Sequence, residues 1–84
     1  MGSKRFGGAL FVAHPLDHNP PHLHVFIGDA QIIIELTIDG RVVLSQRANA
    51  VRGATASEVR RVLAIGGEHF DGLRQLWEDA HGEN

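Results

Sequence analysis

The chain has 84 residues and no cysteine, and its ten acidic and eight basic residues give a net charge of −2. A chain of this length forms one domain, residues 1–84, with a thin core. The absence of cysteine excludes disulfides and thiolate metal sites. The charge balance disfavours nucleic acid as a partner, and no apolar run approaches the roughly 20 residues of a membrane span. We therefore expect a cytoplasmic protein with no membrane contact.

The first predicted strand lies in the apolar run FGGALFVA and covers residues 9–14. The loop HPLDHNPP follows. Its paired prolines exclude a helix or a central strand and stiffen the backbone. We assign no role to the opening Met-Gly-Ser.

A predicted hairpin comes next. Residues 22–27, HLHVFI, alternate apolar and polar side chains, as a half-buried strand does. Gly28 suits the first central position of a two-residue type II′ turn, which leads into the strand AQIIIELTI. This loop length stacks apolar residues of both strands on one face. The predicted pairs are Ile27 with Ala30, Phe26 with Gln31, Val25 with Ile32, His24 with Ile33, Leu23 with Ile34, and His22 with Glu35.

A second hairpin is predicted at Asp39-Gly40, before the strand RVVLS. A two-residue loop would turn the apolar residues of this strand to the polar face. A three-residue loop over residues 39–41, with a glycine bulge, pairs Ile38 with Val42 and Leu36 with Leu44. We prefer the three-residue loop because it keeps one apolar face.

The C-terminal part predicts a helix. Residues 46–54 lack a period and are predicted to be a connection. Thr55 and Glu58 form a capping box at the start of the helix. Its apolar residues recur at alternating spacings of four and three and make one stripe: Val59, Leu63, Gly66, Phe70, Leu73 and Trp77. The Gly66-Gly67 pair predicts either a helix that is kinked or split near these residues or a close approach to the sheet.

Together these elements predict an α+β fold. The sheet is antiparallel with three to four strands, and one C-terminal helix, continuous or split, packs on one face. The histidines lie on the uncovered face.

Two segments resemble a family of small bacterial proteins catalogued as domain of unknown function 4160. They are DHNPPHLHVFIGDAQIIIEL, residues 17–36, and more loosely EHFDGLRQLWEDA, residues 68–80. Related helices generally carry helix formers where this chain has Gly66-Gly67. The resemblance implies no assigned activity. It implies a context, because such proteins are often encoded beside another small protein, in pairs suspected of being toxin–antitoxin modules.

Candidate metal ligands cluster in DHNPPHLH. His22 and His24 sit two residues apart on the predicted strand, so their imidazoles face the same side and can reach one ion. If the loop folds back, His18 adds a third nitrogen. Asp17, or Glu35 across from His22, would complete the ligand set or orient an imidazole. Such donors suit a divalent transition metal such as zinc, and the sequence does not choose among zinc, nickel, copper and iron.

Two other interpretations of these histidines remain open. They could be half-exposed, hydrogen-bonded residues that hold the loop on the solvent face of the sheet without a metal. They could also form a recognition face with Asn19, Pro20 and Pro21, on which Phe26 is an apolar anchor. The edges of a small antiparallel sheet would also permit a homodimer.

Three further histidines are weaker candidates. His14 and His69 would join the cluster only if the first strand and the helix lie beside it. His81 is expected to be solvated.

For function, we expect a small cytoplasmic binding or regulatory protein, one component of a toxin–antitoxin-like pair. Its histidine-rich face would recognise a protein partner or a second copy of the chain. The alternative is a compact divalent-metal-dependent hydrolase or nuclease, in which the three histidines hold the ion and Asp17 or Glu35 assists proton transfer. So small a domain leaves little room for a walled pocket, which disfavours the alternative.

Overall fold

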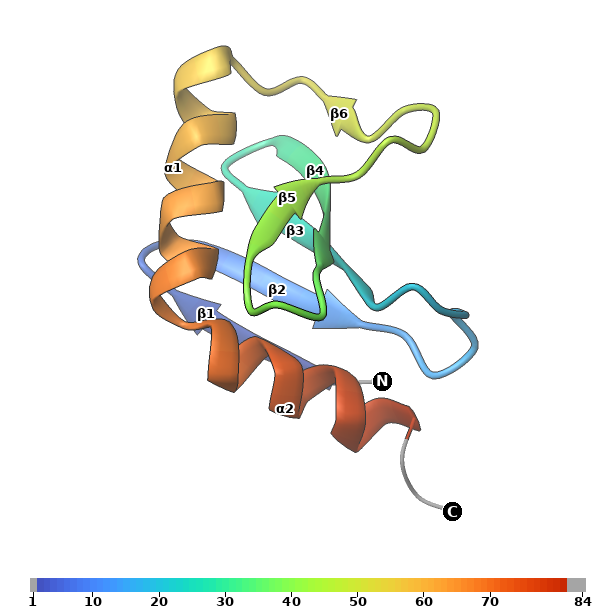
Figure 1. Cartoon of the computed structure of the whole chain (residues 1–84). Coiled ribbons are helices and arrows are strands. Elements are labelled where there is room, and N and C mark those ends of the chain that lie inside the picture. Colours follow the sequence, from blue (N-terminus) through green and yellow to red (C-terminus); the bar gives the residue numbers. More distant parts are fainter. Residues whose placement is uncertain (1, 82–84) are drawn as a thin grey trace.

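A computed structural model describes residues 2–81 of the chain (Figure 1). The elements in chain order are β1 (Gly2–Phe6), β2 (Ala9–Ala13), β3 (His22–Ile27), β4 (Ala30–Leu36), β5 (Val42–Leu44), β6 (Val51–Arg52), α1 (Ala56–Glu68) and α2 (Phe70–His81). Neither helix is long and apolar enough to cross a membrane.

All strands belong to one antiparallel sheet. The strand order is β1-β2-β3-β4-β5, and the short β6 also pairs with β4. The predicted α+β class is confirmed, although the sheet has more strands than the predicted three to four, and two helices stand in place of one.

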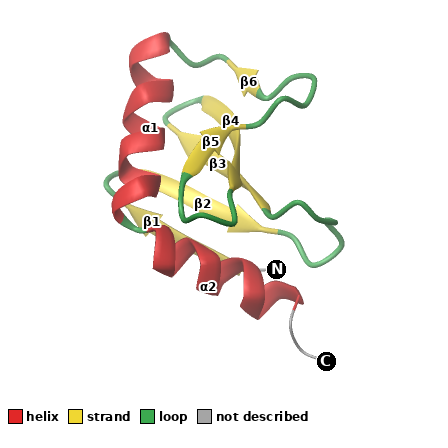
Figure 2. Cartoon of the chain, viewed as in Figure 1, coloured by secondary structure: helices red, strands yellow, loops and turns green. Residues whose placement is uncertain are grey.

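The two helices lie against the same side of the sheet (Figure 2). α1 contacts β5, whereas α2 contacts β1 and β2, at the other end of the strand order. The core between the layers contains the alternate apolar residues of β3 and β4, among them the fully buried Leu23, Val25, Ile32 and Ile34. The core is therefore the apolar face that the hairpin register predicts.

The β3–β4 hairpin confirms the predicted register. All six predicted pairs are observed, from Ile27 with Ala30 to His22 with Glu35. Gly28 adopts a φ of 57°, which an L side chain rarely adopts and which the first central position of a type II′ turn requires. The turn residue and the apolar pattern thus agree on one register.

Strand β1 was not predicted. It pairs with β2 through a two-residue loop, Gly7-Gly8, and both glycines have positive φ (56° and 86°). Two successive residues of positive φ are the mark of a type I′ hairpin turn, so the glycine pair was a hairpin signal. Ser3, Lys4 and Arg5 are all exposed, so β1 has no alternation of apolar and polar residues from which it could have been predicted. Of the opening Met-Gly-Ser, Met1 lies outside the described residues.

The predicted loop of the second hairpin is wrong by one residue. The observed pairs are Leu36 with Val42 and Ile34 with Leu44, so Leu36 does not face Leu44. The Gly40 N–H donates to the Thr37 carbonyl, and Gly40 has a φ of 87°. A loop over residues 38–40 puts this glycine at the position of positive φ, which the predicted loop would have given to Arg41. Ile38 consequently lies at the tip, fully exposed, instead of pairing with Val42.

The helix is split near the glycine pair, as predicted, with the break at His69. His69 ends α1 with a φ of −115° and a ψ of 27°. Thr55 and Glu58 form the predicted capping box. A Cβ on Gly66 would lie 3.1 Å from Val42 Cγ1, whereas a Cβ on Gly67 would meet nothing within 4 Å. Only Gly66 of this pair therefore allows the close approach to the sheet.

Candidate metal centre

His22 and His24 lie at the start of β3, on the side of the strand opposite the fully buried Leu23. They differ in burial. His22 is only 4 % exposed, because its ring lies against the indole of Trp77 in α2, with centroids 5.6 Å apart. His24 is half-buried. The expectation that both are half-exposed on an uncovered face is therefore wrong for His22.

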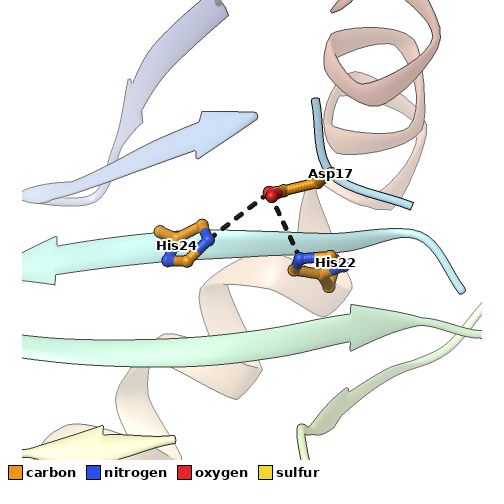
Figure 3. A group of neighbouring side chains, drawn as sticks. All are labelled: Asp17, His22 and His24. Atoms are coloured by element: carbon orange, nitrogen blue, oxygen red, sulfur yellow. Dashed lines mark ion pairs between the residues drawn. The ribbon is translucent and has the colours of Figure 1, made fainter. Parts of the chain in front are cut away.

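A turn brings Asp17 to the two histidines. The Asp17 N–H donates to the His14 carbonyl at 3.1 Å, and Pro15, second in this turn, favours it through its fixed φ. Asp17 Oδ2 then lies 3.2 Å from His22 Nε2 and 3.4 Å from His24 Nε2 (Figure 3). The ligand atoms of the three residues all lie within 4.8 Å of one another.

Two of these separations match those between ligands of one ion. Two ligand atoms about 2.0–2.1 Å from a tetrahedral zinc ion lie about 3.3 Å apart. The two Nε2 to Oδ2 distances, 3.2 Å and 3.4 Å, fall on either side of that value. Among the residues that the structure describes, Asp17 Oδ2 is also the one buried side-chain oxygen without a hydrogen-bond partner. Its contacts to the two rings, at 3.2 Å and 3.4 Å, have ion-pair distances.

The second nitrogen of His22 indicates which ring nitrogen carries the proton. Nδ1 lies 3.0 Å from the Pro20 carbonyl oxygen, which can only accept, and 3.3 Å from the Arg47 guanidinium, which can only donate. One nitrogen cannot satisfy both in a single state. We assign the proton to Nδ1, facing Pro20, because that contact is shorter and the Arg47 side chain is exposed.

In the neutral imidazole, this assignment leaves the lone pair on Nε2, where it faces the Asp17 carboxylate. Histidines that bind metals commonly donate the other ring N–H to a backbone carbonyl in this way. Two lone pairs 3.2 Å apart repel unless a proton or a cation lies between them. The arrangement therefore suits a positive charge between the two atoms, carried by a proton or by a metal ion.

His24 is disposed to be neutral. Burial lowers the pKa of its imidazole below the ordinary value. The Asp17 carboxylate opposes this shift, whereas the neighbouring His14 and His22 rings reinforce it. A neutral imidazole has a lone pair available for a metal.

Helix α2 holds the Asp17 loop in place. One ring nitrogen of His81 lies 2.9 Å from the Asp17 carbonyl oxygen and the other lies 2.8 Å from that of Trp77. The His81 ring stacks on the Trp77 indole, with centroids 3.7 Å apart. His81 was expected to be solvated, but its ring is half-buried and lies against the indole and two carbonyl oxygens. The spacing of His81 four residues after Trp77 could have indicated a stacked pair on one helix face.

The other predicted site residues lie outside the three-residue cluster. His18 is exposed, and the Glu35 carboxylate, although paired with His22 across the strands, accepts a hydrogen bond from Ser45 Oγ at 3.1 Å. His14 lies beside the cluster, with its ring centroid 4.8 Å from that of His24. His69 stacks on Phe6 and takes no part in the cluster.

The residues of the predicted recognition face are mainly exposed. Asn19 and Pro20 are exposed and Pro21 is half-buried. Phe26, on the same strand as the histidines, is 39 % exposed. A shallow cavity of about 530 Å³ lies elsewhere, at the junction of the two helices. It is lined by Gly40 and residues 67–72, none of which belongs to the cluster.

Comparison with known proteins identifies the family. No curated protein and no solved structure gives a significant match to this chain. The family described as domain of unknown function 4160 matches residues 9–78, which include the whole cluster and most of both helices. The chain therefore belongs to the domain of unknown function 4160 family.

Proposed function

We propose that the protein binds one divalent transition metal ion, such as zinc, through Asp17, His22 and His24. The observation that carries this proposal is the buried Asp17 Oδ2, which lies 3.2 Å and 3.4 Å from two imidazole nitrogens. Two nitrogens and one carboxylate oxygen form a donor set that such ions accept. A bound metal ion would take the place of a proton between these atoms and form coordination bonds with them.

In this proposal the ion fixes a recognition loop. Asp17 belongs to the loop of residues 14–21, whereas the two histidines belong to β3, so one ion joins the loop to the sheet. In Figure 1 the loop projects from the sheet on the side away from α1. It presents the exposed Leu16, His18 and Asn19. A loop ordered before binding loses less conformational entropy when a partner binds it.

The partner that we propose is a protein. Leu16, which is 86 % exposed, supplies an apolar contact at the loop tip, and Phe26 supplies a second on the sheet. The resemblance to suspected toxin–antitoxin proteins supports a regulatory pair in the cytoplasm, with the partner encoded alongside. A second copy of the chain is the other protein that the exposed edge of β1 could accept.

A second candidate function follows from the number of ligands. Three protein ligands leave a zinc coordination position for water, which the ion would activate for hydrolysis of a substrate. This is the hydrolase or nuclease alternative. The cavity at the helix junction does not serve it, because its lining shares no residue with the cluster.

The experiment is metal analysis of untagged protein, together with zinc titration by calorimetry. We expect close to one zinc per chain for the wild type. The double variant His22→Ala, His24→Ala should lose the heat of binding, and circular dichroism should show that it remains folded. His18→Ala is the matched control, because this exposed histidine lies in the same motif outside the cluster. A wild type that contains no metal and takes up no zinc would refute the proposal.

A further inference from the structure

His14 is tied to two of the three proposed ligands. It directly follows β2, and its carbonyl accepts the Asp17 N–H at 3.1 Å. Its half-buried ring meets the His24 ring at 77°, with centroids 4.8 Å apart. The backbone turn and the ring contact thus bring this side chain to the edge of the proposed metal site.

Ring separations indicate whether imidazoles can share an ion. A nitrogen about 2.0–2.1 Å from zinc puts the ring centre roughly 3.2 Å from the ion, so two rings at the tetrahedral angle lie about 5.2 Å apart. The His22 and His24 rings lie 5.7 Å apart, and the His14 and His24 rings 4.8 Å apart. Both separations lie near the value for two ligands of one ion.

We propose that His14 is the fourth protein ligand, an inference that rests on the proposed metal binding. The group of ligand atoms within 4.8 Å of one another does not include His14, so its ring must turn to bind. The side chain is half-buried and has only two torsions to adjust. Three imidazoles and one carboxylate then give zinc the four ligands of a closed site.

A closed site favours a structural metal over a catalytic one. Structural zinc sites use four protein ligands, whereas catalytic sites keep one position for water. With His14 bound, the ion joins the end of β2 and the Asp17 turn to the start of β3. The metal therefore fastens both sides of the turn that begins the recognition loop, and it activates no water.

The test compares His14 with His18, the exposed histidine on the other side of Asp17. We would measure zinc affinity by competition with a chromophoric chelator for the wild type, His14→Ala and His18→Ala. Loss of a ligand should weaken binding at least tenfold, given that changes in the outer shell alone cost about 10- to 100-fold. His18→Ala should bind as the wild type does.

A ligand exchange gives a readout that loss of structure cannot imitate. His14→Cys should bind cobalt(II) and add a thiolate-to-cobalt charge-transfer band in the near ultraviolet. His18→Cys should not add this band. Undiminished zinc affinity in His14→Ala, with no such band in His14→Cys, would overturn the fourth ligand and support the open, catalytic site. A wild type that binds no zinc would instead overturn the proposed function itself.

Discussion

The two faces of β3 are built from alternate residues of one short strand, yet different parts of the chain cover them. One face carries Leu23 and Val25, which are fully buried in the core. The other carries His22 and His24, which meet a loop and the end of a helix. The period of two determines which way each side chain points. It does not determine what lies over it, and the chemistry of the second face depends on residues far away in the chain.

The largest effect expected from a single substitution is on the core face. Leu23→Ala should lower the free energy of unfolding by about 2–5 kcal/mol, because it removes buried methyl groups and leaves a cavity. Urea denaturation measures the change. Since no atom of the cluster is removed, the folded fraction should still bind zinc. A loss below about 1 kcal/mol would contradict the tight packing that full burial of Leu23 implies.

Asp17→Asn tests the face of β3 that carries the histidines. Whether it lowers or raises the free energy of unfolding should depend on whether zinc is bound. At a free zinc concentration 100 times the dissociation constant, binding should stabilise the wild type by about 2.7 kcal/mol. The variant should lose most of this gain. With a chelator present, the variant should be at least as stable as the wild type, because the asparagine amide can donate to an Nε2 lone pair that the carboxylate repels.

The measurement is urea denaturation with zinc and with a chelator. Asp29→Asn is the matched control, because Asp29 is exposed in the turn after β3. If Asp17→Asn is strongly destabilising in the chelator, the carboxylate supports the fold without a metal. The cation argument would then lose its basis.

Local signals predicted the parts of the fold whose contacts are close in sequence. The β3–β4 register follows from alternation and one glycine turn, and the start of α1 follows from Thr55 and Glu58. The second hairpin failed because its register depends on which loop residue takes positive φ. Assigning that position to Gly40 would have given the observed loop.

The site was predictable only in part, for a related reason. The spacing of His22 and His24 placed both rings beside one point, and their neighbour Asp17 completes the cluster. Trp77 and His81 could not be assigned to the site, because their positions depend on where the helix divides and how α2 crosses the sheet. The Gly66-Gly67 pair marks the neighbourhood of that division, but it does not give the residue, His69, or the angle between the helices.

The smallest change in stability is expected for substitutions of Gly66 and Gly67, which precede the break between α1 and α2. Gly67→Ala should stabilise the protein by about 0.5–1 kcal/mol, because alanine favours the helix and its Cβ would meet nothing within 4 Å. Gly66→Ala gains the same propensity but brings its Cβ to 3.1 Å from Val42 Cγ1. It should therefore stabilise less than Gly67→Ala or destabilise. Thermal and urea denaturation of both variants give the difference, and equal stabilisation would mean that β5 shifts freely and that Gly66 is not needed for the close packing of α1.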